Sequence, residues 1–126
     1  MNRFVHVVED DPNIRFIVEY ILKDASYMVQ TFANAWAFQN RSKEQPVDLV
    51  ILDVMLPDGN GIDLSKELKT DSVTCHIPVL IMSAHCSSTI AFQDGKADEF
   101  IQKPFDLNTF IFKVDEIVKR RPNNLI

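Results

Sequence analysis

The fold is decided by Val47-Asp48-Leu49-Val50-Ile51-Leu52-Asp53, a run that is apolar apart from Asp48 until it ends in a carboxylate. A short apolar run without alternation predicts a strand covered on both faces, at the centre of a parallel sheet. The turn residues Pro57-Asp58-Gly59-Asn60-Gly61 follow, and a helix is expected from about Ile62 to Lys69. This stretch therefore predicts one strand–loop–helix unit of an α/β domain.

The same alternation continues on both sides of this unit. Short apolar runs predict further strands over residues 4–8, 28–32, 77–82 and 99–102. Apolar residues with helical spacing predict a helix that starts near Asp11-Pro12 and a final helix from Leu107 to Val118, with shorter helices over about 34–41 and 87–93. Five strand–helix pairs predict a (βα)5 fold, a doubly wound parallel sheet with right-handed crossovers and helices on both faces.

Two of the expected helices have weak sequence signals. The helix over 34–41 lacks a regular apolar stripe, and Trp36 and Phe38 are expected to supply its packing. The helix over 87–93 begins with the poor helix formers Ser87-Ser88-Thr89 and has only Ile90-Ala91-Phe92 to bury. A short helix is therefore expected there.

Length and composition bound the class of protein. The 126 residues, 46% apolar and 25% charged, fit one globular domain, expected over residues 1–121 with 122–126 as a C-terminal tail. The formal net charge of −5 argues against direct binding to nucleic acid. No apolar run approaches the roughly 20 residues of a membrane span. Cys75 and Cys86 lack metal or redox spacing and no signal peptide is expected, so they are interpreted as free thiols in a reducing cytoplasm.

Polar groups follow four of the predicted strands at the points where the strands end. Glu9-Asp10-Asp11 follows the first strand, Asp53 the third, Ser83 the fourth and Lys103-Pro104 the fifth. The carboxyl ends of parallel strands share one edge of a sheet, where ligands bind in open α/β folds. We therefore expect these side chains to converge on a single site.

The charges of this site indicate a cation. Two carboxylates ~5 Å apart repel by about 3 kcal/mol at an effective dielectric of ~20. A hard divalent ion such as Mg²⁺ suits the oxygen-only ligand set, and no His or Cys arrangement suits zinc. Lys103 adds a fixed positive charge that can pair with a carboxylate or with phosphoryl oxygens. Asp11 directly precedes Pro12 and is predicted to cap the first helix instead.

In their order and spacing these residues resemble the motifs of receiver domains of two-component response regulators, of the single-domain type. The resemblance extends up to about Arg120, and it implies a flavodoxin-like sheet with strand order 2-1-3-4-5. It rests on Val8-Glu9-Asp10-Asp11-Pro12, on the stretch from Leu52 to Gly61, on Met82-Ser83-Ala84 and on Lys103-Pro104-Phe105.

The resemblance implies a role for each residue of the site. Asp53 corresponds to the phosphoacceptor, a nucleophile that becomes an aspartyl phosphate. Asp10 is expected to bind Mg²⁺ directly and Glu9 through water, with Asp53 and the backbone carbonyl of Met55 as further ligands. The lysine of Lys103-Pro104 is expected to pair with a phosphoryl oxygen, and the proline to follow a cis peptide bond that aims the lysine inward.

Further residues are implied to act in switching and in the lifetime of the phosphoryl group. Ser83 corresponds to the hydroxyl that moves to the phosphoryl group on activation, and Phe100 to the aromatic that rotates with it. Met55 and His85 stand at positions that influence how long the phosphoryl group survives. Lys96 departs from the family pattern, which commonly has a glycine there.

The function implied by the resemblance is a phosphorylation-dependent signalling switch. A histidine kinase or a histidine phosphotransfer protein would donate the phosphoryl group, and an output partner that the sequence does not identify would read it. Such a protein catalyses only its own phosphorylation and dephosphorylation. Because the sequence ends soon after the last predicted helix, we expect a free-standing receiver or an excised domain, with no direct contact to nucleic acid or membrane.

Three other functions suit these residues less well. A Mg²⁺-dependent phosphatase of the haloacid dehalogenase type also uses an aspartyl nucleophile, but it needs a second acid where Met55 stands. A flavodoxin-type flavin binder needs a phosphate loop rich in Ser, Thr and Gly after the first strand, and here that loop is acidic. A pseudo-receiver would serve as an adaptor without being phosphorylated, although every key side chain is present.

Overall fold

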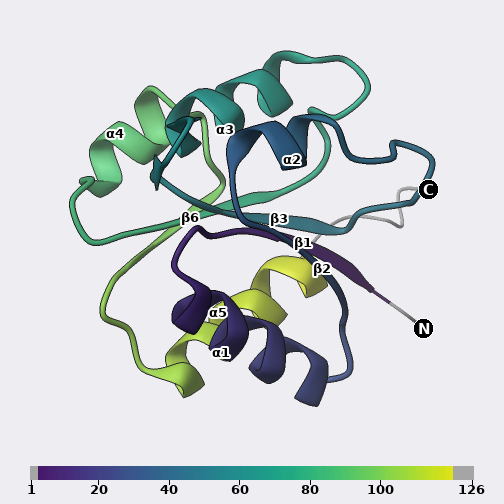
Figure 1. Ribbon diagram of the computed structural model, residues 1–126, viewed down its shortest axis with the longest axis vertical. Helices are drawn as coiled ribbons and strands as arrows, with labels where there is room; N and C mark the ends of the chain where they lie inside the picture. Colours follow the sequence, from purple (N-terminus) through teal and green to yellow (C-terminus); the bar gives the residue numbers. More distant parts are fainter. Residues whose placement is uncertain (1–2, 121–126) are drawn as a thin grey trace.

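The computed structural model describes residues 3–120 and shows a five-stranded parallel sheet with helices on both faces. The strands are β1 (Phe4–Val8), β2 (Met28–Phe32), β3 (Leu49–Asp53), β4 (Met55–Leu56), β5 (Gly59–Asn60), β6 (Val79–Ser83) and β7 (Glu99–Gln102). The helices are α1 (Pro12–Asp24), α2 (Ala35–Gln39), α3 (Gly61–Thr70), α4 (Ser88–Gln93) and α5 (Leu107–Arg120). Figure 1 shows α2, α3 and α4 above the sheet and α1 and α5 below it.

The strand order β2-β1-β3-β6-β7 confirms the predicted doubly wound topology, in which the chain passes to the other side of β1 after β2. β4 and β5 are not members of this sheet. They form a small antiparallel hairpin directly after β3, with Met55 opposite Asn60 and Leu56 opposite Gly59. The sequence predicted only a turn there, because strands of two residues leave no periodic pattern.

The central strand separates two apolar cores. All five residues of β3 are buried. Val50 and Leu52 pack on the α2–α3–α4 side, and Leu49 and Ile51 pack on the α1–α5 side. This alternation between two covered faces explains why the strand is a continuous apolar run in the sequence.

Several boundaries differ from the prediction by a few residues. β6 begins at Val79 and not at residue 77, because the Ile77 N–H is donated to the Thr74 carbonyl (2.9 Å) and Pro78 has no N–H to offer. α2 is shorter than 34–41, with Asn34 as its cap, accepting from the Ala37 N–H. The helix over 87–93 does form, with Ser87 as its cap.

The expected packing role of Trp36 was wrong. Its side chain is 68% exposed, whereas Phe38 is 2% exposed. In so short a helix only Ala35 and Phe38, three residues apart, face the sheet. Trp36 therefore points away from the core.

Lys96 has a backbone φ of +56°, the left-handed region that favours glycine. It lies in the turn between α4 and β7, directly after Gly95. This backbone conformation is the physical reason why a glycine suits the position.

The remaining expectations concern the ends of the chain and the membrane. Residues 1–2 and 121–126 lie outside the described part of the chain, and with them the predicted tail and the limits of the predicted domain. Among residues 3–120 no helix is long and apolar enough to cross a membrane.

Candidate functional site

Three acidic side chains meet at the carboxyl edge of the sheet. β1 and β3 are parallel neighbours with Val8 opposite Leu52, so the residues that follow each strand lie side by side. Glu9, Asp10 and Asp53 each offer a carboxylate oxygen, and these oxygens lie within 4.8 Å of one another. The convergence expected from the strand ends is therefore present for the carboxylates.

Lys103 reaches the same point from the end of β7. Its Nζ lies 2.7 Å from Glu9 Oε1 and 3.3 Å from Asp53 Oδ1. The Lys103–Pro104 peptide bond is cis, and the Lys103 N–H donates to the Ser83 carbonyl (2.9 Å). One ammonium group thus bridges two of the three carboxylates.

Burial makes the Lys103–Glu9 contact electrostatically important. Glu9 is fully buried, and this burial raises the pKa of its carboxyl group although the hydrogen bond from Lys103 opposes the change. Burial by itself would lower the pKa of Lys103, but the hydrogen bond and charge of Glu9, with the charge of Asp53, raise it instead. Lys103 therefore stays protonated in the site.

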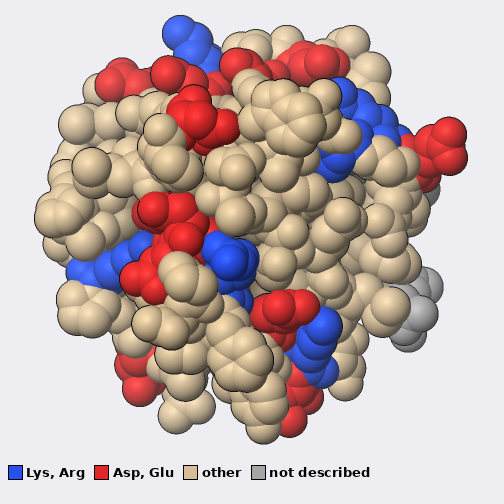
Figure 2. Space-filling view, in the orientation of Figure 1, with Lys and Arg blue, Asp and Glu red and all other residues tan. Residues whose placement is uncertain are grey.

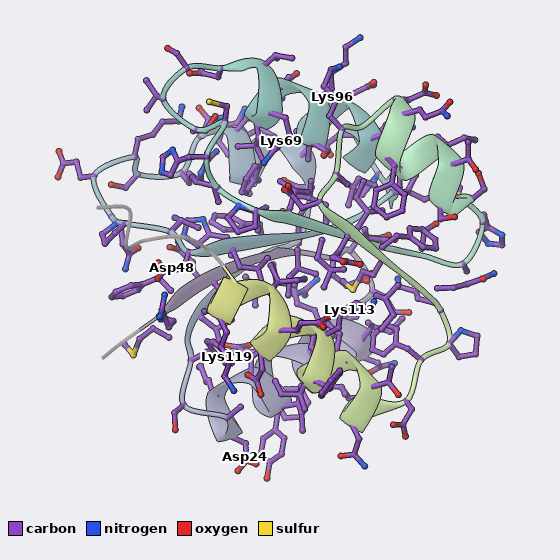
Figure 3. The ribbon with its side chains drawn as sticks, turned by 180° about the vertical axis from the view of Figure 1, so that it is seen from behind. Asp24, Asp48, Lys69, Lys96, Lys113 and Lys119 are labelled. Carbon is purple, nitrogen blue, oxygen red and sulfur yellow. The ribbon has the colours of Figure 1, made fainter. Side chains whose placement is uncertain are left out.

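Two other lysines, Lys69 and Lys113, pair with carboxylates outside this site. In Figure 3, Lys69 and Lys113 lie on opposite sides of the sheet, and they pair with Asp98 (2.8 Å) and Glu99 (3.4 Å). Asp48 lies at the edge where the strands begin, and its carboxylate accepts from the Phe4 N–H (2.8 Å).

Figure 2, in the orientation of Figure 1, shows acidic and basic side chains gathered on the left at the height of the sheet.

The backbone behind Asp53 is packed tightly. Asp53 Oδ1 accepts from the Val54 N–H (2.9 Å), and the Gly61 N–H donates to the Val54 carbonyl (2.8 Å). A Cβ at Gly61 would lie 2.0 Å from the Asp53 carbonyl oxygen, so only glycine fits. The sequence showed Gly61 as a turn residue, and its role behind Asp53 was missed because the contact is visible only in three dimensions.

Comparison with known proteins identifies the fold family. The response regulator receiver domain family matches residues 5–115. This chain belongs to the response regulator receiver family. The match covers the sheet, the acidic cluster and Lys103.

Individual relatives agree with this assignment. The chain is 29% identical over 119 residues to the response regulator ArlR of Staphylococcus epidermidis (93% of this chain, 53% of the relative). It is 32% identical over 116 residues to the DNA-binding dual master transcriptional regulator RpaA of Synechocystis (90% and 48%). The receiver domain thus spans about half the length of these curated relatives.

Among solved structures, the BeF3-activated receiver domain of DrrB, a response regulator from Thermotoga maritima, superposes with a TM-score of 0.83. The two are 28% identical in sequence, and the match covers 95% of this chain and 100% of the other.

The implied switch residues lie on the neighbouring strands. Ser83 is buried at the end of β6, and its Oγ accepts from the N–H groups of His85 (3.1 Å) and Cys86 (3.0 Å). Phe100 lies in β7 and packs partly buried against the core on the α2–α3–α4 side. Met55 is 61% exposed after Asp53, and His85 is exposed in the turn after Ser83.

The loop after β1 is held by two further contacts. Asp11 caps α1, as predicted, with its Oδ1 accepting from the N–H groups of Asn13 (2.8 Å) and Ile14 (3.2 Å). The Arg15 guanidinium donates to the carbonyls of Glu9 (2.8 Å) and Asp10 (3.2 Å). Arg15 was not singled out from the sequence, because a basic residue on a helix gives no signal of a backbone contact.

The donor set of this receiver domain fits a magnesium ion. Three carboxylates gather around a single ammonium group, and all the side-chain ligands offered are oxygens. Mg²⁺ prefers one or two carboxylates with carbonyl oxygens and waters. The exposed Asp10 and the Asp53 carboxylate are the groups best placed to hold it, with buried Glu9 behind them.

Proposed function

We propose that this receiver domain is a phosphorylation-dependent switch that accepts a phosphoryl group on Asp53 in a Mg²⁺-dependent reaction. The observation that carries the proposal is the contact of Lys103 Nζ with both Glu9 and Asp53 inside the acidic cluster. A lone acidic cluster would suit many cations. A fixed ammonium group beside the same carboxylates can in addition stabilise the negative charge of a phosphoryl group that becomes bonded to one of them.

The chemistry follows from the positions of the side chains. A carboxylate oxygen of Asp53 attacks the phosphorus of a phosphohistidine, an O–P bond forms, the N–P bond breaks, and the released imidazole takes a proton from water. A Mg²⁺ ion would be held by Asp10, Asp53 and the Met55 carbonyl, with Glu9 through water, and would neutralise charge on the phosphoryl oxygens. Lys103, already 3.3 Å from Asp53, turns from Glu9 to a phosphoryl oxygen.

The phosphodonor is proposed to be a histidine kinase or a histidine phosphotransfer protein in the cytoplasm. A groove of about 420 Å³ opens beside Lys103 and is almost entirely apolar. Its lining includes Ile14 and Ile17 of α1, and Phe105 and Leu107 around the start of α5. A partner that presents its phosphohistidine to Asp53 can bury an apolar surface in this groove.

The signal is proposed to leave through Ser83 and Phe100. Ser83 Oγ now accepts hydrogen bonds from the backbone of the turn that follows β6. Its hydroxyl proton can be donated to a phosphoryl oxygen, and this movement would draw in that turn and alter the packing of Phe100 beneath α4. Met55 and His85, both exposed near the site, are proposed to control access of the water that hydrolyses the aspartyl phosphate.

Intact mass spectrometry tests the proposal. The protein is incubated with acetyl phosphate and Mg²⁺, beside a sample with a chelator and the Asp53→Asn variant. We expect one added phosphoryl group only in the complete mixture with the unaltered protein. If no adduct forms, and if beryllofluoride with Mg²⁺ also leaves the fold unperturbed, the chain is a pseudo-receiver adaptor.

A further inference from the structure

Asp58 makes a contact that the reaction described so far does not use. It lies in the turn between β4 and β5, five positions after Asp53. Its Oδ1 accepts from the Ala35 N–H (2.8 Å) and its Oδ2 from the Trp36 N–H (2.9 Å). These N–H groups belong to the first turn of α2, where the helix itself supplies no acceptors. One carboxylate therefore clamps the hairpin to a helix more than twenty residues away, and the two hydrogen bonds lower the pKa of Asp58.

The clamp is supported by close packing of small residues. A Cβ at Gly59 would lie 3.0 Å from the Cβ of Ala35, so the hairpin sits directly on the start of α2. Ala35 is buried at this contact. Asn34, the residue before the helix, caps a different N–H, that of Ala37. Asp58 is thus the residue of the β4–β5 turn that accepts hydrogen bonds from the first N–H groups of α2.

The hairpin needs such an outside support. β4 and β5 contain two residues each, and a two-stranded hairpin of this size is not stable by itself in water. Met55, whose backbone carbonyl is assigned to the metal ion, is the first residue of β4. The position of that carbonyl therefore depends on what holds the hairpin, and a metal ligand must be held to within about 0.5 Å.

We propose that Asp58 is a positioning residue for metal binding: by clamping the β4–β5 hairpin to α2, it fixes the Met55 carbonyl at the site formed with Asp10 and Asp53. The proposal rests on the proposed function, because it takes the Met55 carbonyl as a ligand. It assigns Asp58 no contact with the ion or with the phosphoryl group.

Two substitutions and one control separate this role from a simple effect of charge. Asp58→Asn removes a charge and leaves one acceptor for two N–H groups, whereas Asp58→Glu keeps the charge and displaces the carboxylate by one methylene. Asp63→Asn removes a charge from the exposed first turn of α3 and serves as the matched control. Mg²⁺ affinity is measured by calorimetric titration of each protein without any phosphodonor, and hydrogen exchange is followed at the Ala35 and Trp36 amides.

We expect both Asp58 variants to bind Mg²⁺ about tenfold more weakly, the lower end of what outer partners of metal ligands contribute. Asp63→Asn should bind as the unaltered protein does, and the two amides should exchange faster only in the Asp58 variants. With acetyl phosphate, the Mg²⁺ concentration for half-maximal phosphorylation should rise by the same factor, with the rate at saturating Mg²⁺ unchanged.

Other outcomes overturn the proposal. If the amides exchange faster while Mg²⁺ affinity is unchanged, Asp58 only caps α2. If Asp58→Glu binds Mg²⁺ normally while Asp58→Asn and Asp63→Asn are equally weakened, the effect is one of charge. If the unaltered protein binds no Mg²⁺, the proposed function itself fails, and this result is distinct from the first two.

Discussion

Acid should destabilise this protein through one buried imidazole, that of His6 in β1. The side chain is 2% exposed, and among the described residues neither ring nitrogen has a hydrogen-bond partner. The rings of Phe32 and Phe38 pack edge-on against it, at centroid distances of 5.3 and 6.3 Å. A proton added here would place a charge in an apolar core with no acceptor for it.

The size of the effect follows from the pKa. Burial, helped by the positive charge of Arg41, lowers the pKa of His6 from 6.5 to about 4. The unfolded chain therefore binds the proton more readily than the folded one. The stability contributed by neutral His6 is complete above pH 6.5 and is lost as the pH falls toward 4. At about 1.4 kcal/mol per pKa unit, the gap corresponds to about 3 kcal/mol.

Urea unfolding of the unaltered protein and of His6→Leu, at pH 7 and at pH 4, measures the contribution of His6 to the free energy of unfolding. Groups that titrate in both proteins cancel in the comparison, including Glu9, whose raised pKa acts with the opposite sign. Between pH 7 and 4 the unaltered protein should lose about 3 kcal/mol more stability than the variant. An equal loss in both proteins would show that His6 is protonated without penalty and would refute the reasoning.

Further predictions concern the site and one turn. Lys103→Met leaves buried Glu9 without its cation, so the free energy of unfolding should fall by about 3 kcal/mol without Mg²⁺ and by less with it. Urea titration measures both losses, and an equal loss with and without Mg²⁺ would contradict a site that Lys103 shares with the metal ion. Gly61→Ala places a Cβ 2.0 Å from the Asp53 carbonyl oxygen, so the backbone after Asp53 must move and phosphorylation by acetyl phosphate should slow at least about tenfold. An unchanged rate would show that the position of this backbone is unimportant. Lys96→Gly removes the strain of a left-handed backbone conformation at a residue with a side chain, and it should raise stability by about 1 kcal/mol in thermal unfolding. A loss of stability would mean that contacts of the lysine side chain stabilise the fold by more than the backbone strain costs.

The sequence predicted the sheet well because its strands are buried on both faces. β3 is a continuous apolar run for that reason, and its neighbours are short apolar runs of the same kind. The convergence of Glu9, Asp10, Asp53 and Lys103 followed from the parallel topology alone, since the carboxyl ends of all strands share one edge. These features depend on patterns that are local in the sequence or on a general rule of topology.

The features that were missed depend on contacts between distant segments. The clamp from Asp58 to Ala35 and Trp36 joins residues more than twenty positions apart and has no periodicity. Trp36 was expected in the core because of its residue type, but the short helix turns it outward. The close approach of Gly61 to Asp53 likewise leaves no mark in the sequence beyond a glycine in a turn.

The central claim, that Asp53 receives the phosphoryl group, is tested most directly by locating the modified residue. After incubation with acetyl phosphate and Mg²⁺, borohydride reduces an acyl phosphate to the alcohol, which converts a phosphorylated aspartate into homoserine. Peptide mass spectrometry should find homoserine at position 53 alone, and in no sample that contains a chelator. Reduction at Asp10, or of Glu9 to its own alcohol, with Asp53 intact, would contradict the assignment and place the nucleophile elsewhere in the acidic cluster.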